Sequence, residues 1–489
     1  MVYVAHKQRT PPIFLFKSGF TNRALVQYQQ LPEMEVVPRK RRPYSTLEKL
    51  EMKKTLVALA AVSAVSAFAQ VSITGYFGGS YDNFAISNIN AARTGAASEN
   101  RVSDQSSRLI FNVSEDLGGG LTALGQYDLR FKVDAAARIQ GETATSTFTG
   151  TSAANAAAAG TVATVNNPAV DPVTNGNIHV GLKSAAVGTL KLGRQDIYYT
   201  EAANYLPGGL FLAANPAPVV HSLNGVTMAN WSRTPNLAWF ESNRISGIQA
   251  TVGYSTMPLR SSATSEVESN MGTTTNTGHG GGSYLKLNYA NGPLDLTYAV
   301  ISFKSGYAGG TAYATQTGAY GAALNGTNPD QDAQTIVAKY DLNNGLKVAA
   351  SYHKNKATYV NAVAVAAQSA YAVGVPALSA GSQQTAAAWA LSSIYTVGPN
   401  NFTVNYAKRG NLSYDGVAVD ATGVKQLTLA YTYDLSKMTS VGVMYTTLNS
   451  GANTQTSMFY QGNNAYGGQT FAMSGETQKM TSIALRKNF

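Results

Sequence analysis

The segment LTALGQYDLRFKV, residues 121–133, alternates between two kinds of side chain. Its odd-numbered positions are apolar or aromatic, from Leu121 through Tyr127 to Val133, whereas most even-numbered positions are polar or charged. A period of two residues is the pattern of a β-strand, whose successive side chains point to opposite faces. One apolar face and one face that carries acids and bases suit a wall between lipid and water.

The same alternation returns along the chain, and short turns separate many of the segments. Each short turn contains Gly, Asn, Pro or Asp, which supply the dihedral angles of tight turns. These seven turns lie at residues 116–120, 185–188, 246–247, 291–293, 343–345, 397–400 and 434–438. Eight longer polar connections are expected at residues 83–106, 134–176, 196–232, 256–282, 304–333, 355–383, 409–424 and 450–477. Seven short and eight long connections together predict sixteen strands.

The composition agrees with a membrane barrel. Only 13% of the residues are charged, and the chain has 46 Gly and 28 Tyr but no Cys. The lack of Cys excludes disulfides and thiolate metal sites. Sixteen strands are enough to leave an aqueous channel. The sequence therefore predicts an all-β fold: a 16-stranded antiparallel transmembrane β-barrel with short periplasmic turns and long outer loops.

The N-terminal part of the chain has a different character. Residues 52–69 begin Met-Lys-Lys, continue with an apolar run and end Ala-Phe-Ala, which is the pattern of a secretory signal peptide. We therefore interpret residues 1–51 as a mis-annotated upstream extension and residues 70–489 as the barrel. Without residues 1–54, the net charge falls from +10 to +3, so the basic balance gives no support to a nucleic-acid partner.

Several motifs occur in an order that resembles a known family. The motifs are Ser107-Arg108, Glu115-Asp116-Leu117-Gly118-Gly119-Gly120-Leu121-Thr122-Ala123, Gly193-Arg194-Gln195, Arg233-x-x-Asn236, Tyr433-Asp434-Leu435-Ser436-Lys437 and the terminal Phe489. Together they resemble the trimeric Gram-negative general porins of the betaproteobacterial type. The chain departs from that pattern at Ser242-Asn243, at Lys487 and in its long, Ala-rich second loop.

The resemblance implies a homotrimer in the cell outer membrane, surrounded by outer-membrane lipid, that lets small hydrophilic solutes and ions diffuse passively. It also implies that the third loop folds inward, so that acids on the loop face bases on the wall. The loop acids are Asp196 and Glu201, and the wall bases are Arg108, Arg130, Lys132, Lys191, Arg194 and Arg233. Because bases outnumber acids here, we expect an anion-preferring pore. Phe489 resembles the signal that the outer-membrane assembly machinery reads.

Arg194 needs a local irregularity to take part in such a constriction. Simple alternation with Leu190 and Leu192 would turn its side chain to lipid, where a charge is costly. A β-bulge at Gly193 would turn it inward, and the motif favours this second orientation.

An outer-membrane adhesin, a surface-binding barrel without a wide open channel, is the alternative, because long polar loops can also bind other surfaces. An enzyme is not expected, since the five histidines are isolated and the sequence has no His-Glu-x-x-His, Gly-x-Ser-x-Gly or Walker A motif. We expect no catalytic residues, cofactor or metal.

The signal-peptide interpretation predicts the N-terminus of the mature protein. N-terminal sequencing or mass spectrometry of protein from outer membranes should begin at Gln70, because cleavage follows the Ala67-Phe68-Ala69 site. Peptides from residues 2–42 in the same material would contradict this interpretation.

Overall fold

The computed structural model describes residues 70–91, 97–131, 133, 176–197, 210–223, 226–228, 233–256, 280–304, 329–359, 379–454, 456, 458 and 474–489. The expected extension 1–51 and signal peptide 52–69 lie outside these residues.

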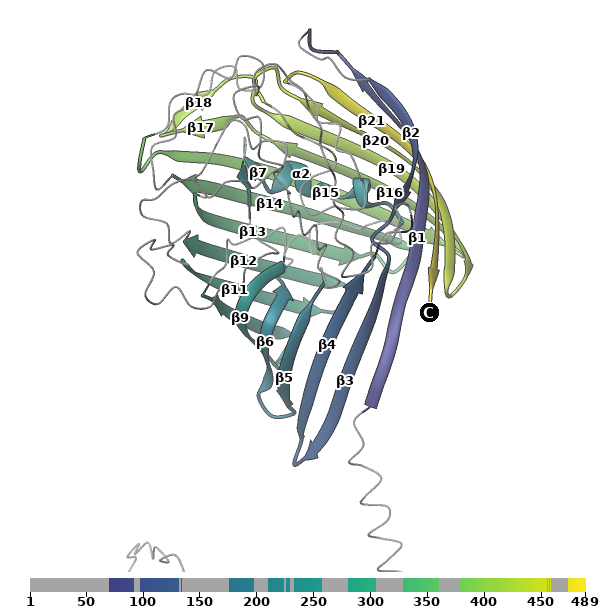
Figure 1. Cartoon of the computed structure of the whole chain (residues 1–489), viewed down its shortest axis with the longest axis vertical. Coiled ribbons are helices and arrows are strands. Elements are labelled where there is room, and N and C mark those ends of the chain that lie inside the picture. Colours follow the sequence, from purple (N-terminus) through teal and green to yellow (C-terminus); the bar gives the residue numbers. More distant parts are fainter. Residues whose placement is uncertain are drawn as a thin grey trace, which may run out of the picture. The chain divides into compact units, whose positions relative to one another are not determined.

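Sixteen of the described strands pair antiparallel with their neighbours around a closed ring (Figure 1). The last strand pairs with the first, which closes the barrel. In ring order the strands are β1 (Gln70–Ser87), β3 (Arg108–Gly118), β4 (Leu121–Arg130), β5 (Ile178–Ser184), β6 (Gly188–Asp196), β9 (Arg233–Ser242), β10 (Ile248–Ser255), β11 (Gly281–Asn291), β12 (Leu294–Lys304), β13 (Asp330–Asp341), β14 (Leu346–Thr358), β15 (Gln383–Val397), β16 (Asn400–Arg409), β19 (Val424–Ser436), β20 (Thr439–Ser450) and β21 (Thr477–Asn488). The predicted 16-stranded barrel is confirmed.

The seven predicted short turns each join two neighbouring strands of the ring. The turn between β13 and β14 shows why its residues are needed: Asn343 and Gly345 both have positive φ, of 58° and 90°. A Cβ on Gly345 would lie 2.3 Å from the carbonyl oxygen of Thr396 on β15, so only glycine fits there.

The predicted alternation is visible in the exposure of the side chains. On β19, Gln426, Thr428 and Thr432 are buried inside the ring, while Leu429 and Tyr433 on the outer face are 45% and 37% exposed. The outer face is thus apolar and aromatic, as a lipid-facing surface requires.

Besides the third loop, two segments expected as loops contain strands. β1 continues to Ser87 and pairs there with β2 (Ser98–Asp104), and β17 (Leu412–Tyr414) pairs with β18 (Val417–Val419). The C-terminal end of β1 was not predicted as a strand, because the side chains that point into the barrel there, Phe84 and Ile86, are apolar and buried. They break the rule of a polar inner face, since they pack against the apolar segment that fills the barrel at this level.

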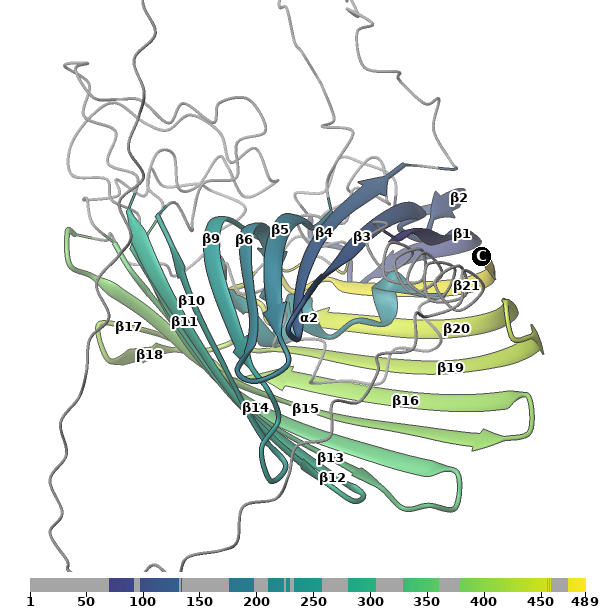
Figure 2. The same ribbon diagram turned by 90° about the horizontal axis from the view of Figure 1, so that it is seen from below.

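The third loop turns into the barrel, as predicted. Its described part contains a 3-10 turn, η4 (Leu212–Ala214), and the single helical turn α2 (Ala217–Val220), followed by the pair β7 (Ser222–Leu223) and β8 (Val226–Thr227). Figures 1 and 2 show α2 on the inner side of the sheet. No helix among the described residues is long and apolar enough to span a membrane.

The C-terminus takes part in closing the ring. The backbones of Phe489 and Gly75 exchange two hydrogen bonds, of 3.1 and 3.2 Å, just beyond the end of β21. The Phe489 ring lies 5.6 Å from that of Phe77 on the outer face, between ring centroids. The residue therefore belongs to both the seam and the aromatic outer surface, and either role is compatible with an assembly signal.

Deleting Phe489 should sharply reduce the yield of folded barrel, because the deletion removes two seam hydrogen bonds and the ring contact with Phe77. The yield would be measured by the mobility of unheated outer-membrane protein on gels. Phe402→Ala, at an outward aromatic on β16, which β19 and β20 separate from the seam strand β21, is the control and should fold normally. A normal yield without Phe489 would remove the proposed role at the seam and in assembly.

Candidate functional site

The inserted third loop packs its apolar side chains against small residues of the wall. Leu210, Phe211, Val219 and Val220 are at most 1% exposed. They form one cluster with inward alanines of β15, β16, β19 and β21, namely Ala388, Ala390, Ala407, Ala430 and Ala484. Gly442 on β20 completes this surface, since a Cβ there would lie 3.2 Å from the Phe211 ring. Small wall residues thus make the room that the loop occupies.

Wall side chains also satisfy the backbone of the loop. Gln426 and Asn355 donate amide hydrogens to the carbonyl oxygens of Ala213 and Val220, at 2.8 and 2.7 Å. From the opposite direction, the Gln105 side-chain oxygen accepts the N–H of Leu212 at 2.9 Å. Buried backbone groups without partners are costly, so these contacts fix the position of the loop within the barrel.

Arg409, an inward residue of β16, is a further anchor and is 0% exposed. Its guanidinium donates to the carbonyl oxygen and hydroxyl of Ser222 at 2.9 Å each. It also donates to the carbonyl oxygen of Thr422 at 3.0 Å and to the hydroxyl of Thr454 at 3.1 Å. One side chain therefore joins the inserted loop to the segments before β19 and after β20.

A histidine pair lies next to this anchor. His221, directly after α2, packs edge-on against His353 of β14, with ring centroids 4.8 Å apart. His353 is held by the hydroxyls of Thr335 and Ser351, at 2.6 and 2.9 Å. Burial, and secondly the neighbouring His353, lower the pKa of His221 well below its ordinary value. The loop therefore docks with a neutral His221.

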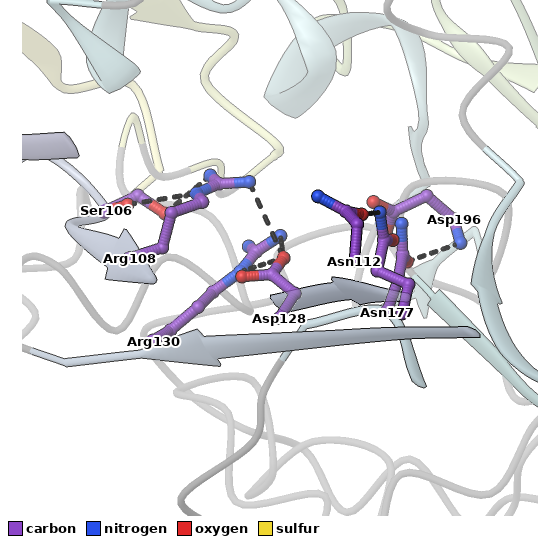
Figure 3. A network of polar contacts seen from close by, with 8 residues as sticks. Ser106, Arg108, Asn112, Asp128, Arg130, Asn177 and Asp196 are labelled. Carbon is purple, nitrogen blue, oxygen red and sulfur yellow. Dashed lines mark hydrogen bonds and ion pairs between the residues drawn. The ribbon is translucent and has the colours of Figure 1, made fainter. Parts of the chain in front are cut away.

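Two of the predicted arginines meet on another part of the wall, formed by β3 and β4 (Figure 3). Arg108 and Arg130 are directly opposite each other in the pairing of these strands. Between them lies the carboxylate of Asp128, 2.9 Å from Arg130 Nη2 and 3.7 Å from Arg108 Nη1. The carboxylate holds two like charges side by side that would otherwise repel each other.

Asp128 itself is only 2% exposed, and Gly176, in the segment just before β5, packs closely against it. A Cβ on Gly176 would lie 2.1 Å from the Asp128 carboxyl carbon, so a glycine is needed at this position. Asp128 was not among the predicted site residues, although alternation places it on the same face as Arg130. The predicted acids lie on the loop, whereas the wall also holds an acid.

Two other predicted site residues, Lys191 and Asp196, lie on β6. Lys191 lies on the inner face of β6, and Asp196 is opposite Arg233 in the pairing of β6 with β9. The side-chain oxygen of Asn177 accepts the backbone N–H of Asp196 at 2.8 Å. Lys132, Glu201 and the side chain of Arg233 lie outside the described residues.

The irregularity expected beside Arg194 is present. The register of β6 with β9 shifts between Gly193 and Gln195, and Gly193 has a φ of 139°. The Nε atom of Arg194 is buried, whereas Leu190 and Leu192 on the same strand are exposed. Both observations favour the inward orientation of Arg194.

A further basic residue, Arg486 on β21, was missed. Its guanidinium lies 3.6 Å from the centroid of the Tyr76 ring, and that of Arg108 lies 5.0 Å from the same centroid. Such cation–π contacts stabilise the positions of both arginines. Its inward orientation could have been predicted from the sequence, because Arg486 follows the inward Ser482 and Ala484 at intervals of two residues. The described residues contain no group of three or more His, Cys, Asp or Glu that could hold a metal ion.

Comparisons with known proteins agree with this architecture. Residues 55–453 match the family model of the Gram-negative porins. No curated protein matches the chain. Among solved structures, the anion-selective porin from Comamonas acidovorans is similar, with 18% identity, a TM-score of 0.55 and coverage of 86% of this chain and 100% of that one. Outer-membrane expressed OmpT of Vibrio cholerae matches with 9% identity, a TM-score of 0.52 and coverage of 86% and 98%. At these identities the structural likeness concerns the fold alone.

The buried His221 predicts that loop docking weakens in acid. A histidine whose pKa is lowered on docking stabilises the docked state fully above its unperturbed pKa of about 6.5, and progressively less below it. Each pH unit below that value should cost about 1.4 kcal/mol of docking free energy until the docked histidine is itself protonated. The current noise of single channels should therefore rise as the pH falls.

His221→Gln should reduce this pH dependence, because glutamine stays neutral. His179→Gln on β5 is the matched control and should keep the dependence of the parent protein. Equal pH dependence in the His221 variant and the parent protein would assign the acid response to other groups.

Proposed function

The chain belongs to the Gram-negative porin family and is an outer-membrane channel; we propose that it lets small hydrophilic solutes and ions diffuse passively and that it prefers anions. The observation that carries the anion preference is the inward arginine cluster of the wall. Arg108, Arg130 and Arg486 bring three positive charges together, and Asp128 offsets one of them. Two positive charges remain in excess.

The position of the cluster gives this charge its effect. The described part of the loop packs against the inner faces of β9, of β11 to β16 and of β19 to β21, so we infer that the open passage runs beside the charged wall of β3 to β6. In a narrow passage with low-dielectric walls, little water screens a fixed charge. Fixed positive charge there stabilises anions and destabilises cations. The pore therefore sorts solutes by size and by sign of charge.

The similarity to a porin described as anion-selective supports the same preference. The wall base Lys191 and the predicted inward Arg194 and Arg233 would add to it. We also propose that the channel is a homotrimer, as the family resemblance implies, with part of the outer wall of each subunit covered by its neighbours. The proposed function requires no catalytic group and no cofactor.

Neutralising the wall arginines should shift the ion preference. In the variant with Arg108→Gln, Arg130→Gln and Arg233→Gln, the reversal potential in a salt gradient should move towards cation preference, because fixed positive charge leaves the passage. Planar-bilayer recording at low salt measures this shift. It also tests the channel itself, since a barrel without a wide channel, as in the adhesin alternative, would give no stepwise currents.

Two further variants should shift the ion preference in the opposite direction, towards anions. Asp128→Asn, nearly isosteric, should strengthen anion preference because it removes the acid between the arginines. Glu201→Gln should act in the same direction if this part of the loop enters the lumen. A triple variant that conducts with the reversal potential of the parent protein would show that these arginines do not set the ion preference.

A further inference from the structure

A row of polar and aromatic side chains crosses five neighbouring strands on the outside of the barrel. Each member is directly opposite the next in the strand register, from β14 to β20. The row consists of Tyr352, Trp389, Lys408, Lys425 and Asn449. Lys408, Lys425 and Asn449 lie near the ends of their strands that lead into the long loops, and so towards the outer side of the membrane.

The two lysines at its centre face outward. Lys408 and Lys425 are exposed, while the residues on either side of each one, such as Ala407 and Gln426, are buried inside the ring. Alternation along the strand therefore places both ammonium groups on the outer surface.

This pairing is unfavourable within the protein. Lys408 and Lys425 are cross-strand partners, and like charges directly opposite each other destabilise a sheet. Two other outward lysines at this rim have acidic partners, since Lys304 lies 3.2 Å from Asp330 and Lys356 lies 3.0 Å from Asp332. Among the residues that the structure describes, no carboxylate lies within salt-bridge distance of Lys408 or Lys425. The pair therefore fits an anion supplied from outside the chain.

The neighbours of the lysines indicate what kind of molecule supplies it. Trp389 is 37% exposed on the outer face and packs 5.3 Å from the Tyr406 ring, measured between centroids. Exposed Trp and Tyr on a membrane barrel lie at the level of lipid headgroups. Below them, Leu391 and Val404 continue the apolar surface towards the membrane centre. An anion at this height, beside an apolar surface, is the headgroup of a lipid.

We propose that Lys408 and Lys425, flanked by Trp389, bind the phosphate of an anionic lipid in the outer leaflet. Two ammonium groups share one phosphate, which relieves their mutual repulsion, and the acyl chains lie against the apolar surface below. Basic clusters beside a membrane recognise anionic headgroups in this way. The inference does not depend on the ion preference of the pore.

The test compares lipid binding by two double variants of the full protein in neutral detergent. Lys408→Gln with Lys425→Gln removes the site. Lys437→Gln with Lys487→Gln removes the same charge from exposed lysines at the opposite, short-turn rim. Native mass spectrometry would count bound short-chain phosphatidic acid, with phosphatidylcholine as the probe of neutral net charge. The mobility of unheated protein on gels checks that both variants fold.

We expect the first variant to bind phosphatidic acid about thirtyfold more weakly than the parent protein, the change that corresponds to about 1 kcal/mol per lysine. The control variant should bind like the parent, and excess inorganic phosphate should not displace the lipid. Three outcomes would overturn the proposal: equal loss in both variants, equal retention of phosphatidylcholine and phosphatidic acid by the parent, or full competition by inorganic phosphate. Loss of subunit association in the first variant alone would instead assign this surface to a contact between copies of the chain.

Discussion

Backbone N–H and C=O groups inside a lipid layer have no water to bind, and each group left without a partner costs several kcal/mol. The closed ring provides these partners, because every strand of the barrel is hydrogen-bonded to a neighbour on both sides. The same constraint returns inside the barrel. The part of the third loop that packs against the wall is irregular and buried, so its carbonyl groups need donors. Gln426, Asn355 and Arg409 supply them from the wall.

The outline of the fold was predictable because it depends on local patterns. Alternation marks each strand, and turn residues such as Asn343 and Gly345 mark the short connections. The inner wall opposite the loop was not predictable in this way. Ala388, Ala407 and Phe84 point inward although they are apolar, because their partner is the inserted loop and not water. That partner is distant in sequence, and no local pattern reveals it.

The charged site was predictable in part for a similar reason. Alternation and motif together indicated Arg108 and Arg130, and their side-by-side placement is observed. The role of Asp128 depends on the tight approach of Gly176, and that of Arg486 on the meeting of the first and last strands around Tyr76. Neither contact follows from the residue pattern of a single strand. The prediction missed one acid and one base of the wall, Asp128 and Arg486, so the expected excess of four positive charges is unchanged.

Arg409 ties together parts of the channel that face different environments. Its guanidinium bonds the inserted loop at Ser222 and two segments at the outer mouth, at Thr422 and Thr454. A movement of either outer segment takes a hydrogen-bond acceptor away from the same group that holds the loop. The outer segments and the inserted loop are thus joined through one side chain, so a molecule that binds the outer segments is expected to change the position of the loop without entering the channel.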